Sequence, residues 1–169
     1  GAVAGGGHEG GLRAGTTNVP LVVGAAEAFR LAMLEREERL AHVTPLRDRL
    51  LRELPAVLPG RCVVTGHPTE RLPHHTSFAL RGLSGNDLLM HLDLAGIAAS
   101  SGSACASGDP KPSAILEALG LGAEWTKGGL RLTLGRQNTA ADVDAVLAAL
   151  PDIINRLAAV EERFALAHA

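Results

Sequence analysis

The stretch Gly129-Leu130-Arg131-Leu132-Thr133-Leu134 alternates leucines with polar side chains. Successive residues of a β-strand point to opposite faces, so this alternation predicts a strand with one buried face and one solvent-facing face. A strand of this kind needs a sheet, and its apolar face needs a covering layer. The stretch therefore predicts a small sheet covered by helices.

Hydrophobic spacing and the positions of proline and glycine predict the elements upstream of this strand. A long helix should begin at Pro20 with a buried apolar start, and Pro45 should kink it or divide it. The other expected elements are strands at 62–65, 76–80 and 97–99, and helices at 86–94, which Ser84 caps, and at 112–119.

A last helix should begin at Thr139, with Asp142 as its capping-box partner. The predicted order is thus helix, strand, strand, helix, strand, helix, strand, helix. This order predicts an α/β fold in which a few-stranded, mainly antiparallel sheet is covered by helices, with a long helix at each end.

Composition limits the class of protein. The chain has 169 residues, 46% of them hydrophobic and 2% aromatic, with a formal net charge of −2. These values exclude a disordered chain, and they argue against a nucleic-acid partner because a basic face and stacking aromatics are lacking. No apolar run approaches the ~20 residues that span a bilayer, so no membrane partner is expected. With no signal peptide and no initiator Met, we expect a cytoplasmic protein and a processed product or a fragment.

The two cysteines lie in different contexts. Cys62 is in an apolar run, which predicts a small buried side chain in a strand. Cys105 lies in the segment 100–108, where six of nine residues are Ser or Gly. Such a segment cannot pack a core, so it should be an exposed, mobile loop whose thiol is a flexible nucleophile. The alternative is an incidental surface cysteine.

Three further features are candidates for binding. The glycines at 5–7, together with Arg13 and Thr16, are typical of an anion-binding loop or of a plain linker. Arg131 on a mostly apolar strand should need a carboxylate, either in a structural ion pair or on a ligand. His74 and His75 are adjacent and should point in opposite directions, so no metal site is predicted, although a zinc-binding module remains an alternative hypothesis.

Three stretches together resemble the pyridoxal-phosphate cysteine desulfurases of the NifS/IscS type, within the class V aminotransferase-like family of fold type I. They are GGGHE at 5–9 followed by LRAGTTN at 12–18, then SSGSAC at 100–105 with PS at 112–113 and LG at 119–120, and finally LRLTLGR at 130–136. Their order and spacing are similar to those of the family along the whole chain.

The resemblance implies roles for three residues. Cys105 would attack the sulfur of the substrate L-cysteine and become a persulfide, leaving L-alanine. Arg131 would bind the substrate carboxylate. Thr16 would contact the pyridoxal-phosphate phosphate of the partner subunit in a homodimer. The sulfur would pass to an acceptor or scaffold protein for iron–sulfur cluster or thio-cofactor assembly.

The resemblance also implies how the chain is divided. Residues 1–18 would be a remnant of the large cofactor domain, and 19–169 would be the C-terminal small domain. In the family, the Schiff-base lysine precedes the glycine triplet, and neither Lys111 nor Lys127 matches it. We therefore expect a missing N-terminal large domain, no covalent cofactor on this chain, and no activity of the chain alone. The alternative function is a sulfur-carrier or interaction module that uses Cys105 without pyridoxal phosphate.

Overall fold

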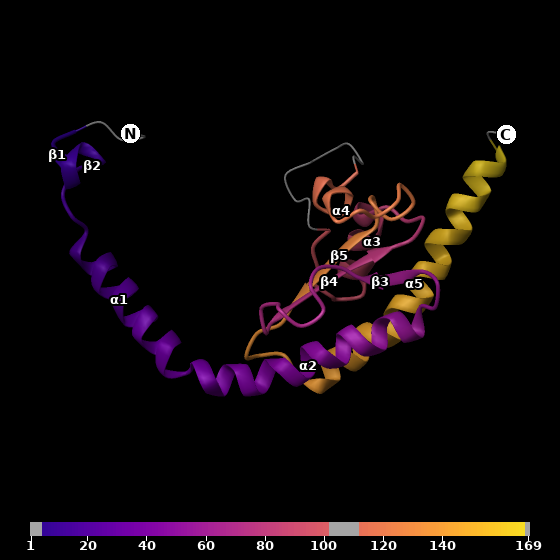
Figure 1. Ribbon diagram of the computed structural model, residues 1–169, viewed down its shortest axis with the longest axis horizontal. Helices are drawn as coiled ribbons and strands as arrows, with labels where there is room; N and C mark the ends of the chain where they lie inside the picture. The colour runs from indigo at the N-terminus through magenta and orange to yellow at the C-terminus, as the bar shows by residue number, and fades with distance from the viewer. Residues whose placement is uncertain (1–4, 102–111, 168–169) are drawn as a thin grey trace. The chain divides into compact units, whose positions relative to one another are not determined.

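The computed structural model describes residues 5–101 and 112–167 (Figure 1). The chain divides into two compact units, Gly1–Glu38 and Arg39–Ala169. The boundary predicted between residues 18 and 19 concerns domains of a larger protein and stays a prediction.

The first unit contains a short hairpin and one helix. Strands β1 (Gly7–His8) and β2 (Arg13–Ala14) pair antiparallel around the 3₁₀ turn η1 (Glu9–Gly11). Helix α1 (Val19–Leu34) begins after Asn18, whose Oδ1 accepts the N–H of Leu21 at 3.2 Å.

The apolar start of α1 is not buried, so that part of the prediction is wrong. No residue of α1 is buried, and Val23 and Phe29 are 62% and 70% exposed. The hairpin of the same unit is too small and too polar to cover a helix face. An apolar helix therefore lies uncovered in the described chain.

Helix α2 (Arg36–Val57) runs on through Pro45, so of the two predicted alternatives, a kink or a division, the division is wrong. The break falls instead at Glu35, where the N–H donates to the carbonyl of Leu31 at 2.9 Å and closes α1. Val43 and Leu50, on either side of Pro45, are both buried. Their packing compensates for the single backbone hydrogen bond that a proline removes from a helix.

The second unit is built on a three-stranded antiparallel sheet. Its strands are β3 (Cys62–Val64), β4 (His75–Leu80) and β5 (Gly129–Thr133), in the order β3-β4-β5. The strand expected at 97–99 does not form, and only Ser100 makes an isolated bridge, to Arg131. Ile97 and Ala99 pack against the core instead of entering the ladder.

Helices cover one face of this sheet. They are α2, α3 (Gly85–Leu94) and α5 (Ala140–Ala167), while the short α4 (Ala114–Ala118) follows the undescribed segment (Figure 1). The core between them includes these fully or almost fully buried side chains: Leu50, Leu54, Phe78, Leu80, Leu88, Leu92, Leu130, Leu150, Ile153 and Ile154. The buried Thr76 hydroxyl donates to the carbonyl of Leu132 at 2.8 Å, so this polar group is satisfied within the core.

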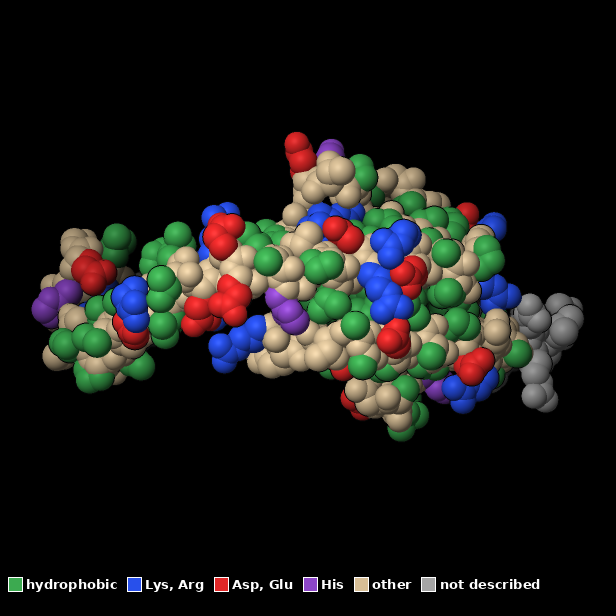
Figure 2. Space-filling view, turned by 90° about the horizontal axis from the view of Figure 1, so that it is seen from below, with side chains coloured by type: hydrophobic (Ala, Val, Ile, Leu, Met, Phe, Trp, Pro, Cys, Tyr) green, Lys and Arg blue, Asp and Glu red, His purple; other side chains and the backbone are tan. Residues whose placement is uncertain are grey.

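Capping residues lie at the N-terminal ends of α3 and α5, as predicted. Ser84 caps α3 by accepting the N–H of Asp87, and the Asp142 carboxylate accepts the N–H of Thr139 at 2.7 Å before α5. Figure 2 shows basic and acidic side chains interspersed on the face seen there. Arg49 of α2 pairs with Asp144 of α5 at 2.6 Å.

The fold class is confirmed: an α/β small domain with small antiparallel sheets and long helices near both ends. Cys62 is buried as predicted, and burial raises the pKa of its thiol to about 12. Within the described residues, no helix combines the length and apolarity that crossing a membrane would require.

Candidate functional site

The face of the sheet opposite the core carries polar side chains. Phe78 and Leu130 point into the core, so their neighbours Ser77 and Arg131 point to the other face, where they lie directly opposite each other in the register. Together with Thr65 and His75 they line a cavity of about 270 Å³, which we call the open-face pocket.

Arg131 is exposed on this face, and it is hydrogen-bonded to Ser100 through both its backbone and its side chain. The backbones of the two residues exchange hydrogen bonds of 3.0 and 2.6 Å, and Arg131 Nη2 donates to Ser100 Oγ at 3.2 Å. Among the described residues no carboxylate forms an ion pair with Arg131, so the structural ion pair considered from the sequence is not found there. The remaining guanidinium donors suit a ligand carboxylate.

Two hydroxyl groups continue across the sheet from Arg131, that of Ser77 on the neighbouring strand and that of Thr65 beyond it. Thr65 follows β3, its N–H donates to the carbonyl of Ser77 at 2.9 Å, and its Oγ1 donates to Ser77 Oγ at 2.7 Å. Thr65 is 6% exposed, so this hydrogen bond satisfies a buried hydroxyl.

The pocket is electrostatically suited to an anion. None of its described lining residues is acidic, and Arg131 brings a permanent positive charge. Burial lowers the pKa of His75, and the charges of Arg131, Arg71 and His74 lower it further. His75 is therefore neutral at physiological pH and leaves Arg131 as the dominant charge.

The chain on each side of the Cys105 segment is held at this pocket. Ser101 and Ser113 both line it. A Cβ at Gly129 would lie 2.5 Å from the Ser101 carbonyl oxygen, so the absence of a side chain there permits the close approach. The N–H of Ser113 donates to the carbonyl of Thr126 at 2.8 Å. Cys105 itself, like Lys111, lies outside the described residues.

The other predicted binding residue, Thr16, is in the first unit. The Arg13 guanidinium donates to the carbonyls of Gly15 and Thr16 at 3.2 and 3.0 Å, and to Thr17 Oγ1 at 3.2 Å. Arg13 thereby shapes the turn that presents Thr16, whose side chain is exposed. The turn is suited to contact with a phosphate.

Covalent attachment of pyridoxal phosphate requires a lysine, and none of the described pocket residues supplies one. Lys127 is exposed and does not line the pocket. The described residues therefore fit recognition of a carboxylate and of a phosphate, but they do not fit a Schiff base. Nor do they bring together three or more His, Cys, Asp or Glu side chains that could hold a metal.

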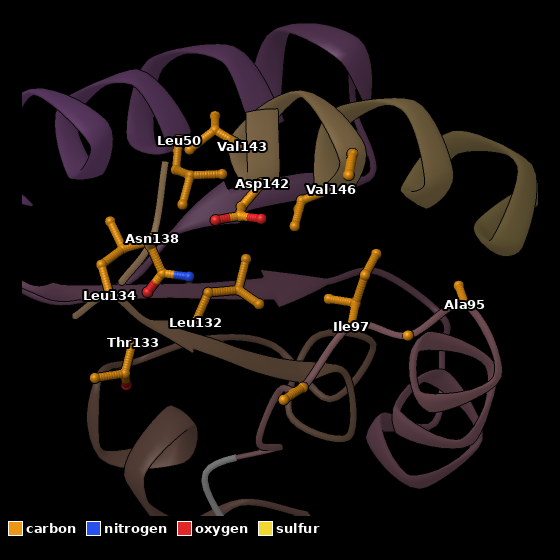
Figure 3. Close-up of a pocket in the computed structure, with 13 residues that line it drawn as sticks. Leu50, Ala95, Ile97, Leu132, Thr133, Leu134, Asn138, Asp142, Val143 and Val146 are labelled. Carbon is orange, nitrogen blue, oxygen red and sulfur yellow. The ribbon is translucent and has the colours of Figure 1, made fainter. Parts of the chain in front are cut away.

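A second cavity, of about 430 Å³, lies on the core side between α2, α5, β5 and residues 95–98 (Figure 3). Its polar groups are already engaged, because Asn138 Oδ1 accepts the N–H of Gly135 at 2.8 Å and Asp142 accepts that of Thr139. Hydrogen bonds from the backbone N–H and the hydroxyl of Thr139, and one from the Asn138 amide, lower the pKa of Asp142. Most of the other side chains that line this cavity are apolar.

Residues 7–146 match the family model described as aminotransferase class-V. The chain belongs to this family. Among its curated relatives, it is 41% identical over 155 residues to "Cysteine desulfurase IscS 1" of Archaeoglobus fulgidus, which covers 92% of this chain and 40% of that protein. It is 43% identical over 156 residues to "Cysteine desulfurase" of Trichormus azollae, which covers 92% of this chain and 39% of that protein.

Solved structures of the family superpose well on this chain. A NifS-like protein from Rickettsia africae has a TM-score of 0.75 at 27% identity, over 90% of this chain and 39% of that one. A second NifS-like protein also has a TM-score of 0.75, at 31% identity, over 92% and 39% of the two chains. The family predicted from the three motifs is confirmed, and the chain spans about two fifths of the length of these curated relatives.

Sequence reasoning located Arg131 but missed Thr65, Ser77 and His75 as its neighbours. A partial signal was present: successive strand residues alternate between faces, so Ser77, and His75 just before the strand expected at 76–80, share the face opposite to the apolar Phe78. The alternation assigns these two side chains to the solvent face, but only the strand register places them beside Arg131.

Proposed function

We propose that this chain is the C-terminal part of a homodimeric, pyridoxal-phosphate-dependent cysteine desulfurase. It would transfer sulfur from L-cysteine through a Cys105 persulfide to an acceptor or scaffold protein in the cytoplasm, for iron–sulfur cluster or thio-cofactor assembly. One observation carries the proposal: Arg131, which has no carboxylate partner among the described residues, lines a pocket together with Ser101 and Ser113. The segment that contains Cys105 joins these two serines.

Arg131 would bind the α-carboxylate of L-cysteine. A guanidinium matches a carboxylate with two parallel hydrogen bonds, which set the orientation of the ligand as well as its affinity. The 3.2 Å hydrogen bond from Arg131 Nη2 to Ser100 Oγ leaves other guanidinium N–H groups for the ligand. Orientation matters because the thiol of the bound substrate must point toward Cys105.

Cys105 would act as the nucleophile. Cys105 is four residues along the chain from Ser101, so its Cα can lie at most about 14 Å from that of Ser101. The Cys105 sulfur would attack the substrate sulfur and form an S–S bond while the substrate C–S bond breaks. The carbon keeps the electron pair and takes a proton, so that two thiols give one persulfide and L-alanine. Pyridoxal phosphate, when bound, supplies the electron sink for this chemistry.

Thr16 would donate its hydroxyl to the cofactor phosphate of the partner subunit, and Arg13 would hold the turn in the required shape. The Schiff-base lysine would come from the N-terminal large domain, because Lys127 is exposed away from the pocket. The chain alone should therefore neither attach the cofactor covalently nor release L-alanine.

The decisive experiment measures L-alanine release from L-cysteine by the complete protein that contains this chain, with mass spectrometry of Cys105. We expect the addition of one sulfur atom to Cys105 and loss of both signals in Cys105→Ser. Cys62→Ala is the matched control, since this buried thiol lies on the core face. A complete protein that releases no L-alanine contradicts the proposal, and sulfur accepted on Cys105 from another desulfurase would then favour the carrier function.

A further inference from the structure

A row of polar side chains crosses the open face of the sheet. Thr65 pairs with Ser77 through the backbone, Ser77 lies opposite Arg131 in the register, and Arg131 pairs with Ser100. The outer pairs are each joined by a side-chain hydrogen bond, 2.7 Å from Thr65 to Ser77 and 3.2 Å from Arg131 to Ser100. Between Ser77 and Arg131, at the centre of the row, the described structure has no side-chain hydrogen bond.

The direction of the Thr65–Ser77 hydrogen bond follows from burial. Thr65 is 6% exposed, and its hydroxyl has no described acceptor other than Ser77 Oγ. If Ser77 donated to Thr65, the Thr65 proton would be left buried without an acceptor, which is unfavourable. Thr65 therefore donates, and the Ser77 proton remains for another acceptor.

We propose that Ser77 is a substrate-binding residue that donates its O–H to the same carboxylate that Arg131 binds, with Thr65 as the residue that positions it. Residues directly opposite each other in an antiparallel pair have Cβ atoms about 4.5–5.5 Å apart, which places the Ser77 and Arg131 side chains side by side. A carboxylate has two oxygens, so it accepts from the guanidinium and from the hydroxyl at once. This inference rests on the proposed function for the identity of the carboxylate, the α-carboxylate of L-cysteine.

The surroundings favour this ligand class. The pocket of about 270 Å³ has no acidic residue among its described lining, and His75 is neutral beside Arg131. A small monocarboxylate is thus met by one permanent positive charge and one oriented hydroxyl. The hydroxyl adds a further hydrogen bond to one carboxylate oxygen and restricts more tightly the orientation that the guanidinium sets.

The first test needs no desulfurase activity. In the 169-residue chain, NMR would follow the Nε–H signal of Arg131 during titration with acetate. A hydrogen bond to a charged group contributes about 1.5–3 kcal/mol, so Ser77→Ala should weaken acetate binding roughly 10- to 100-fold. Thr65→Val should weaken it less, because Ser77 keeps its hydroxyl but loses its orientation. Ser77→Thr, which retains a hydroxyl, should bind acetate about as tightly as the wild type.

Thr133→Val is the matched control, because Thr133 is on β5 but does not line the pocket. Equal acetate affinities in the wild type and Ser77→Ala overturn the inference, and so does a wild-type Arg131 signal that does not respond to acetate.

In the complete protein, Ser77→Ala should raise the KM for L-cysteine roughly 10- to 100-fold. An unchanged KM in an active enzyme contradicts the role of Ser77 alone. Absence of L-alanine release by the wild type contradicts the proposed function, while the acetate titration still decides whether Ser77 and Arg131 share a carboxylate site.

Discussion

The two faces of the three-stranded sheet differ in burial, although neighbouring residues of the same strands supply both. Phe78 is fully buried and Leu130 is 1% exposed, while the adjacent Ser77 and Arg131 line an open pocket. Both faces share one backbone, so the difference comes from what covers them. Helices α2, α3 and α5 cover one face, whereas Ser101, Ser113 and residues of α4 line the pocket on the other. Side chains on the covered face should therefore determine the stability of the fold, and side chains on the open face should bind the ligand.

The largest expected effect is on the core face. Phe78→Ala should lower the free energy of unfolding of the second unit by about 3–5 kcal/mol, because the truncated side chain leaves a cavity in a close-packed core. Thr133→Ala on β5 is the control and should stay within about 0.5 kcal/mol, because its side chain is exposed. Urea unfolding measures both. Similar losses in the two variants would contradict the division between the faces.

The thiol on the core face gives the next largest effect. A pKa of about 12 leaves little thiolate on Cys62. At pH 8, iodoacetamide should therefore modify Cys62 about a thousandfold more slowly in the folded chain than in urea. Cys105 should react faster than Cys62 in the folded chain. Peptide mapping after timed quenching measures the two rates, and rapid folded-state labelling of Cys62 would show that the core face opens.

Arg131 tests the open face. In the complete protein, Arg131→Lys should raise the KM for L-cysteine roughly 10- to 100-fold, because lysine retains the charge but loses the two parallel hydrogen bonds. Its free energy of unfolding should change by less than about 0.5 kcal/mol. Arg61→Lys, an exposed change outside the pocket, is the kinetic control. Large destabilisation by Arg131→Lys would mean that side chains of the open face also contribute to the free energy of unfolding.

His75 gives the smallest effect, which depends on pH. Its pKa is lowered in the folded chain, so as pH falls below the ordinary histidine value of about 6.5 the unfolded chain takes up the proton first. Stability is then lost until the pH falls below the folded-state pKa. His75→Asn removes this contribution, so its urea midpoint should fall less between pH 7 and pH 5. Parallel pH profiles of variant and wild type would contradict the assignment.

Elements with strong local signals were predictable. The helix expected at 86–94 forms as Gly85–Leu94 because Ser84 supplies its cap, and the alternating strand at 129–134 forms as Gly129–Thr133. Two of the errors have a different cause. Helix α2 continues through Pro45 because Val43 and Leu50 pack into the core, and residues 97–99 pack there without joining the sheet. Both outcomes depend on tertiary contacts that a local pattern does not contain.

The amino-acid sequence by itself determined the family, the alternation that gives β5 two different faces, and the identity of Arg131 and Thr16 as candidate binding residues. Motifs and alternation are properties of neighbouring residues, so they can be read without a fold. Only the tertiary structure placed Thr65 and Ser77 beside Arg131, because strand register joins residues more than 50 positions apart. It also decided that one face of the sheet is covered by helices, which is why leucines there stabilise the fold while their neighbours remain open to a ligand.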